Sequence, residues 1–147
     1  MYSEPLSHLP DPVHQAEFYE SVTIKRGLAW VIDALFIGIL ATAVSLVTIV
    51  GVFFWPVFFL VVGFLYRWMT LASGSATWGM RIMAIEFRDA YGQRLDGGQA
   101  LLHTLGYTIS MSMVLVQVVS VILMFTTERG QGLTDLVLGT VALNRRA

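Results

Sequence analysis

The chain has 147 residues, of which 56% are hydrophobic and 13% are charged, and its mean hydropathy is +0.69. This composition predicts one integral membrane domain and leaves no room for a separate soluble module. A net charge of −1 argues against a nucleic-acid-binding surface, and the absence of cysteine excludes disulfides, thiolate chemistry and zinc–thiolate sites.

The N-terminal residues 1–24 are expected to form a disordered or loosely docked tail. Pro5, Pro10 and Pro12 disfavour regular structure there. The segment lacks a basic region followed by a short apolar core, so a cleaved signal peptide is not expected. Residues 25–147 are expected to form the membrane domain.

Two apolar runs predict a helical hairpin in the membrane. The first, residues 27–50, follows Lys25 and Arg26 and has about the 20 residues that a helix needs to cross a bilayer core. Gly51 permits a tight turn, and the second run begins at Trp55 and reaches residue 68. Because both outer flanks are basic and the turn carries no charge, both ends of the hairpin are expected on the cytoplasmic side.

The third apolar segment, residues 100–125, leaves two topologies open. As one helix it would span about 39 Å, enough to cross the membrane with some tilt. A crossing would put Arg129 and the two C-terminal arginines outside, against the positive-inside rule. A bend near Gly106, Ser110 and Ser112 would instead return the chain to the cytoplasmic side.

Alternating residues predict a small β element on the cytoplasmic side. Residues 83–88 have the period-two pattern of a half-buried strand, and a turn at residues 89–92 leads to Arg94–Leu95, which could begin a return strand. Residues 140–144 alternate in the same way, and pairing among these segments would require a cytoplasmic C-terminus. The expected fold is therefore all-α and membrane-integral: a helical hairpin, a third apolar membrane segment and a small cytoplasmic-side β element.

Ionisable residues within or beside the apolar runs are the candidate functional groups. Asp33 lies inside the first run, where a charge is costly and is retained where it pairs or works. On a helix Arg26 and Asp33 share a face within about 20° and lie about 10 Å apart along the axis, so a direct ion pair is strained. Trp30 lies between them and could shield them from lipid. Asp135 either caps a helix or turn, or folds back to bridge Arg26 and Asp33.

Each of these charges has an alternative, purely structural role. Arg26 can be a topology anchor that extends into the headgroups, without any partner in the protein. Asp33 can make a structural hydrogen bond between helices, or it can be a functional carboxylate that binds a proton or a cation.

These residues resemble the bacterial RDD family, which is named for one arginine and two aspartates in such settings. Arg26 heads the first helix, Asp33 lies within it, and Asp135 lies in a Gly-Leu-Thr-Asp-Leu-x-x-Gly-Thr-Val context at residues 132–141. Residues 76–83 resemble the Gln-Thr-Leu-Gly-Lys-Arg-Leu-Leu stretch of the family. The resemblance implies a multi-pass protein of the bacterial inner membrane.

Two positions depart from the family pattern. Met80 replaces a lysine and His103 replaces an arginine, and the loss of two cations weakens the case for an anionic ligand. His103 is expected either to titrate near neutral pH or to be a hydrogen-bonded surface group. Trp30, Arg81 and His103 are the expected supporting residues of the polar network.

The resemblance implies no settled molecular function, although transport, including cation/proton antiport, is suggested for the family. Transport would use Asp33, and because three short segments cannot enclose a path, it would need a homo-oligomer or a larger membrane complex. The alternative is an accessory or assembly subunit whose network of Arg26, Asp33 and Asp135 fixes its own fold. No catalytic residue, cofactor or metal site is expected, because the histidines lack ligand spacing, and the bilayer is the expected partner.

Overall fold

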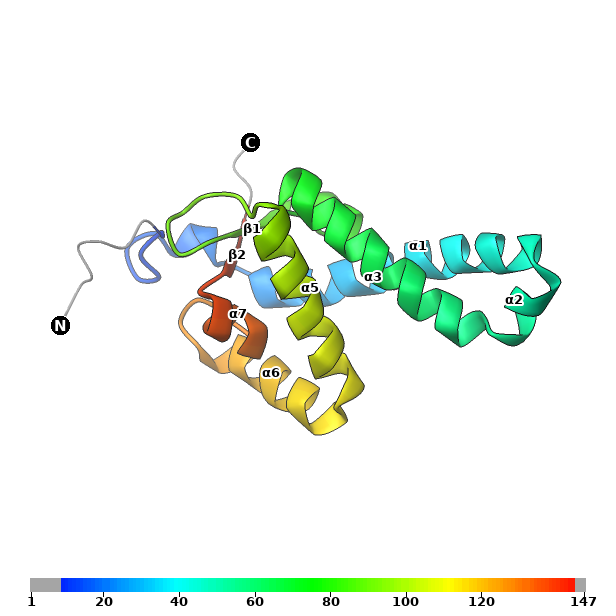
Figure 1. Ribbon diagram of the computed structural model, residues 1–147. Coiled ribbons are helices and arrows are strands. Elements are labelled where there is room, and N and C mark those ends of the chain that lie inside the picture. Colours follow the sequence, from blue (N-terminus) through cyan, green and yellow to red (C-terminus); the bar gives the residue numbers. More distant parts are fainter. Residues whose placement is uncertain (1–8, 145–147) are drawn as a thin grey trace.

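The computed structural model describes residues 9–144, and its most extended feature is a helical hairpin (Figure 1). Helix α1 (Val22–Val47) and helix α3 (Trp55–Gly74) run antiparallel and are joined through the short α2 (Ile49–Phe53). Both long helices are apolar and long enough to cross a membrane. The predicted hairpin is confirmed in its helices, with the difference that the expected tight turn is the short helix α2.

The second half of the predicted tail is ordered and contacts the domain. Helix α1 begins at Val22, inside the expected tail, and a 3-10 turn, η1 (Ala16–Phe18), precedes it. Asn144 Nδ2 donates to the carbonyl oxygens of Glu17 and Glu20 at 2.8 Å each, so residues 16–24 are docked on the domain. The first eight residues of the predicted tail lie outside the described part of the chain.

The third apolar segment bends back. Helices α5 (Gly97–Ser112) and α6 (Val114–Thr126) meet at Met113 with a bend of 118°. Trp68 Nε1 near the end of α3 donates to the carbonyl of Gly97 at 3.1 Å, and Thr23 Oγ1 at the start of α1 donates to the carbonyl of Met124 at 2.9 Å. Both ends of the bent pair therefore lie at the same end of the hairpin.

A two-stranded antiparallel sheet closes this end of the molecule. Strand β1 (Ile85–Arg88) pairs with β2 (Val141–Asn144), with Ile85 opposite Asn144. Helix α7 (Leu133–Leu138) precedes β2, and Gly139, with φ of +75°, turns the chain between them. The predicted pairing is confirmed for residues 140–144, whereas Arg94–Leu95 forms no strand.

One short helix was not predicted. Residues 78–82 form α4 (Trp78–Ile82), so the strand begins at Ile85 instead of Met83, and Ala84 between them has φ of 58°. Residues 75–77, just before α4, are buried, and Ser75 Oγ donates to the carbonyl of Phe87 at 2.6 Å. Ser75, with φ of 58°, is the C-cap of α3, and its carbonyl accepts from the N–H of Phe87 in β1 at 2.8 Å.

The buried core lies at the sheet end, whereas the hairpin tip exposes large apolar side chains. The largest fully buried apolar side chains there are Phe87, Leu71, Ile85, Val22 and Val141. The exposed apolar surface along α1, α3 and α6 is what a helix surrounded by lipid requires. The structure is thus mostly helical, with two helices long and apolar enough to span a membrane, a bent apolar pair and a small sheet.

Candidate functional site

Asp33 of α1 is buried and fully hydrogen-bonded. Its side chain accepts from Tyr66 Oη at 2.6 Å and from the backbone N–H of Gly79 at 2.8 Å, both at Oδ1. Thr77 Oγ1 donates to Oδ2 at 2.6 Å. Three neutral donors therefore compensate a carboxylate that is only 4% exposed.

The geometry of the Asp33 site depends on the start of α4. Thr77 is the N-cap of that helix and accepts from the N–H of Met80 at 3.2 Å. The carboxylate of Asp33 lies beside free backbone N–H groups, where negative charge is favoured. At Gly79 a Cβ would overlap the carbonyl of Ala29 and lie 2.8 Å from Asp33 Oδ1, so only glycine allows this approach.

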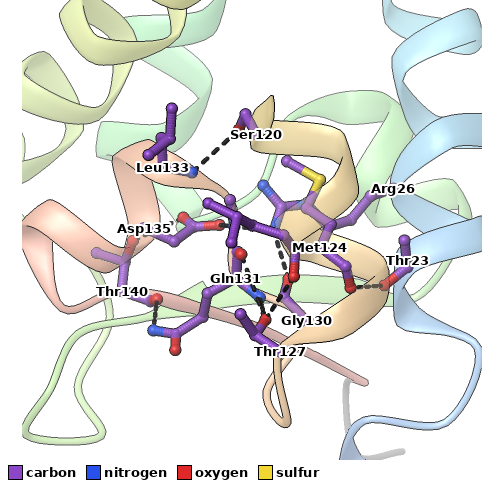
Figure 2. A network of polar contacts seen from close by, with 12 residues as sticks. Thr23, Arg26, Ser120, Met124, Thr127, Gly130, Gln131, Leu133, Asp135 and Thr140 are labelled. Carbon is purple, nitrogen blue, oxygen red and sulfur yellow. Dashed lines mark hydrogen bonds and ion pairs between the residues drawn. The ribbon is translucent and has the colours of Figure 1, made fainter. Parts of the chain in front are cut away.

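Asp135 of α7 is the centre of a second cluster. Arg26 Nη1 pairs with Asp135 Oδ2 at 2.7 Å, and His103 Nε2 lies 2.8 Å from Oδ1. Thr140 Oγ1 donates to Oδ1 at 2.8 Å, and the N–H of Gly132 donates to Oδ2 at 3.1 Å. Figure 2 shows Arg26 directed toward Asp135. Arg26 Nη1 also donates to the backbone carbonyl of Gly130 at 3.2 Å.

The surroundings of Asp135 keep it ionised. Complete burial would raise the pKa of this carboxyl, but the positive charge of Arg26 and the hydrogen bond from His103 hold the pKa below its ordinary value. Because Asp135 is a charged acceptor, the ring hydrogen of His103 is assigned to Nε2. The ion pair of Arg26 and Asp135 is therefore charged and buried.

The structure brings Arg26 and Asp135 together and places Asp33 in a separate cluster. Within residues 9–144 no hydrogen bond or ion pair joins Asp33 to Arg26 or Asp135. Arg26 is not only a topology anchor, because α7 brings a carboxylate to its level. The expectation of a surface His103 is wrong: the ring is 2% exposed and bonded to Asp135.

The other two supporting residues have separate roles. Arg81 Nε donates to the carbonyl of Ala76 at 3.1 Å, and an Nη of Arg81 donates to the carbonyl of Thr70 at 3.2 Å. Arg81 thus satisfies carbonyls near the end of α3. Trp30 Nε1 donates to Tyr107 Oη at 2.6 Å, so it connects α1 with α5.

Two adjoining cavities lie between the apolar helices. The first, of about 470 Å³, is lined mainly by α1, α5, α6 and α7 and has both polar clusters on its wall. The second, of about 390 Å³, lies further along α1, between α1, α3 and α5. The residues common to both walls are Trp30, Asp33, Arg67, Tyr107 and Met111. The bonded pair of Trp30 and Tyr107 therefore forms a partition between the two cavities.

Arg67, which is not among the site residues predicted from the sequence, also lines both cavities. Its Cζ lies 4.0 Å from the centroid of the Tyr107 ring. Its Nε is buried and has no hydrogen-bond partner in the described chain. The sequence did carry a signal for a special role of Arg67. It is a cation within an apolar helix, seven residues and about 10 Å from the helix end.

Apolar helices long enough to span a bilayer, with charged residues on the cavity walls between them, define a helical membrane protein. A search against models of protein families matches residues 21–139 to the RDD family, and the chain belongs to that family. No curated protein and no solved structure matches the chain. The resemblance noted from the sequence is therefore confirmed.

Proposed function

We propose that this protein is a multi-pass protein of the bacterial inner membrane that takes part in the transport of a small ion or ligand. The observation that supports this proposal is the pair of adjoining cavities, which follow one another along α1 and share charged wall residues. Intramembrane charges beside a cavity are typical of solute pathways. The ligand binds in the cavities and passes the partition between them.

The orientation follows from the charges at the sheet end. Lys25, Arg88, Arg94 and Arg129 lie there, together with both ends of the hairpin, and the positive-inside rule places this end in the cytoplasm. The first cavity then faces the cytoplasmic side and the second lies deeper in the membrane.

Asp33 places a carboxylate on the walls of both cavities. Its oxygens accept from Tyr66, Thr77 and Gly79, and these three donors hold the side chain in place. We therefore assign the moving part of the pathway to the partition. The hydrogen bond between Trp30 and Tyr107 holds it closed.

Transport by this chain requires more than one copy. Two spans and one bent pair cannot surround a water-filled path, because open backbone and charges must be shielded from lipid on every side. A homo-oligomer supplies the missing walls, and its contacts involve the exposed apolar faces of the helices.

The partition is tested by comparing two tryptophan variants in proteoliposomes. Trp30→Phe removes the hydrogen bond to Tyr107, and a bond of about 1 kcal/mol corresponds to about a fivefold rise in the open population. Flux of a panel of alkali cations and small anions should rise accordingly. The matched control is Trp55→Phe, since Trp55 bonds to Thr42 at 3.0 Å away from both cavities. Equal flux in both variants would contradict this role.

A second candidate, an accessory or assembly subunit of a larger membrane complex, is favoured by one observation. Both aspartates are satisfied by partners within the chain, as expected for groups that serve only the fold. If wild-type protein in liposomes moves no solute of the panel and instead co-purifies with a defined membrane complex, this second function replaces the first.

A further inference from the structure

We infer that the first cavity binds the oxyanion headgroup of an anionic phospholipid, with the guanidinium of Arg67 as its anchor. This inference rests on the proposed function insofar as that function makes the cavity a ligand site. It adds the chemical class of a molecule that the first cavity binds and the residue that recognises it.

Arg67 is the cation on the cavity wall that makes no direct ion pair with the described residues, and Asp33 and Asp135 attract it only at longer range. The guanidinium of Arg26 is paired with Asp135 at 2.7 Å. Arg67 instead contacts the Tyr107 ring, and in the described residues its buried Nε has no acceptor and the guanidinium has no acidic partner within ion-pair distance. A charge held between apolar helices in this way calls for an anion from outside the chain.

The shape of the guanidinium selects the anion. It presents N–H donors in a planar fork that matches two oxygens of a phosphate or carboxylate group. One face of Arg67 is covered by Tyr107, and the residue lines both cavities. Water could satisfy individual donors, but it would leave the charge unpaired.

The apolar rim of the cavity favours a lipid over a free anion. Ile24 of α1 and Phe125 of α6 line the first cavity and are 61% and 66% exposed. The cavity is therefore continuous with apolar helix faces that can contact acyl chains. An anionic lipid can place its headgroup at Arg67 and its hydrocarbon along these faces.

Asp33 makes the inference sharply testable because it lies on the same wall with the opposite charge. Its repulsion opposes anion binding, whereas Arg67 promotes it. Arg67→Gln should therefore weaken lipid binding and Asp33→Asn should strengthen it. General damage to the fold would weaken binding in both variants, so opposite directions identify an electrostatic site.

The experiment measures lipid binding to purified protein in a zwitterionic detergent by native mass spectrometry. The probes are dioleoyl phosphatidylglycerol, dioleoyl phosphatidylcholine with the same chains, and inorganic phosphate. We expect wild type to prefer phosphatidylglycerol over phosphatidylcholine by at least about tenfold, equivalent to about 1.4 kcal/mol. Arg67→Gln should abolish that preference, and Arg67→Lys, which keeps the charge, should retain part of it.

The control is Arg94→Gln, the same change at an exposed arginine that lies outside both cavities. It should leave the preference unchanged. An Arg67→Gln protein that keeps the full preference, or an equal loss in Arg94→Gln, would overturn the inference. Inorganic phosphate that binds as tightly as the lipid would also overturn it, by making the ligand a free anion.

Failure of this inference can be separated from failure of the proposed function. Solute flux that persists in liposomes of purely zwitterionic lipid, with no lipid preference at Arg67, rejects the lipid site and retains transport. Specific lipid binding without flux of any solute rejects transport and retains the lipid site.

Discussion

Arg26 and Asp135 lie 109 residues apart in the sequence, and their side chains meet at 2.7 Å in the interior of the protein. Asp33, seven residues after Arg26 on the same helix, is bonded to α3 and to the start of α4 instead. Each aspartate therefore fastens a different part of the domain to α1. Asp135 attaches α7 and, through His103, the bent pair, whereas Asp33 attaches the hairpin and α4.

Removing one partner of the buried ion pair should strongly destabilise the protein. Asp135→Asn leaves Arg26 without its counter-charge, and breaking a buried pair costs on the order of 3–5 kcal/mol. Denaturant unfolding in detergent measures the loss. The control is Arg88→Gln, which should cost less, because Arg94 remains 3.7 Å from the carboxylate of Glu86 after Arg88 is removed. Comparable losses in the two variants would mean that the Arg26 pair is hydrated.

The two aspartate clusters should be energetically independent. Asp33 and Asp135 share no hydrogen-bond partner in residues 9–144, so the free-energy losses of Asp33→Asn and Asp135→Asn should add to within about 0.5 kcal/mol. The pair Arg26→Gln and Asp135→Asn should instead be non-additive. A large coupling between the two aspartates would show that they belong to one network after all.

The pH dependence of stability should report Asp135. Its pKa is held below the ordinary value by Arg26 and His103 against the effect of burial, so its ionised form stabilises the fold. This contribution is complete above the unfolded pKa of about 3.9 and is lost as the pH falls toward the lower native pKa. Wild type should therefore lose stability below about pH 4 more steeply than Asp135→Asn. Parallel curves for the two proteins in denaturant titrations would contradict this assignment.

The parts of the fold that follow from lipid chemistry could be predicted from the sequence. The hairpin appears as two apolar runs because every lipid-facing side chain must be apolar, and residues 140–144 appear as a strand because their two faces differ. Helix α4 could not be predicted in this way. Its five residues are too few for a periodic signal, and its first turn is held by the distant carboxylate of Asp33.

The candidate site was predictable in its residues but not in its pairing. The spacing of Arg26 and Asp33 argued against a direct pair, and the structure has none among its described contacts, but nothing local indicated that Tyr66 would bond to Asp33. His103 looked like an interfacial group because its partner, Asp135, lies 32 residues further on. Contacts made between distant segments carry no signature in a single sequence.

The packing of α4 against α1 should depend on the absence of a side chain at position 79. In Gly79→Ala the new Cβ would meet the backbone carbonyl of Ala29, which cannot move independently of α1, and would push the N–H away from Asp33. Overpacking of this kind costs about 1–3 kcal/mol. The control is Gly27→Ala, because a Cβ there meets nothing within 4 Å and should leave the free energy of unfolding unchanged or slightly raised. A neutral Gly79→Ala would mean that α4 can separate from α1.

The bend between α5 and α6 should keep its tip inside the bilayer. Because the natural chain has no cysteine, a single introduced cysteine is the sole target of a membrane-impermeant thiol reagent. Leu115 lies just after the bend and is 81% exposed in the isolated chain, and both ends of the bent pair lie at the sheet end of the hairpin. Leu115→Cys should therefore remain unlabelled from either side of the membrane.

The matched control for this topology is Phe53→Cys at the hairpin tip, which should react from the periplasmic side. A reporter inserted in the exposed turn at Tyr91, and another after the C-terminus, should both read cytoplasmic, because β1 and β2 pair at the same end of the molecule. Periplasmic labelling of Leu115→Cys, or a C-terminal reporter on the periplasmic side, would show that the third segment crosses the membrane. The pairing of β1 with β2 argues against a crossing. If the third segment crossed the membrane, β2 would lie on the opposite side of the bilayer from β1, and the two strands could not pair.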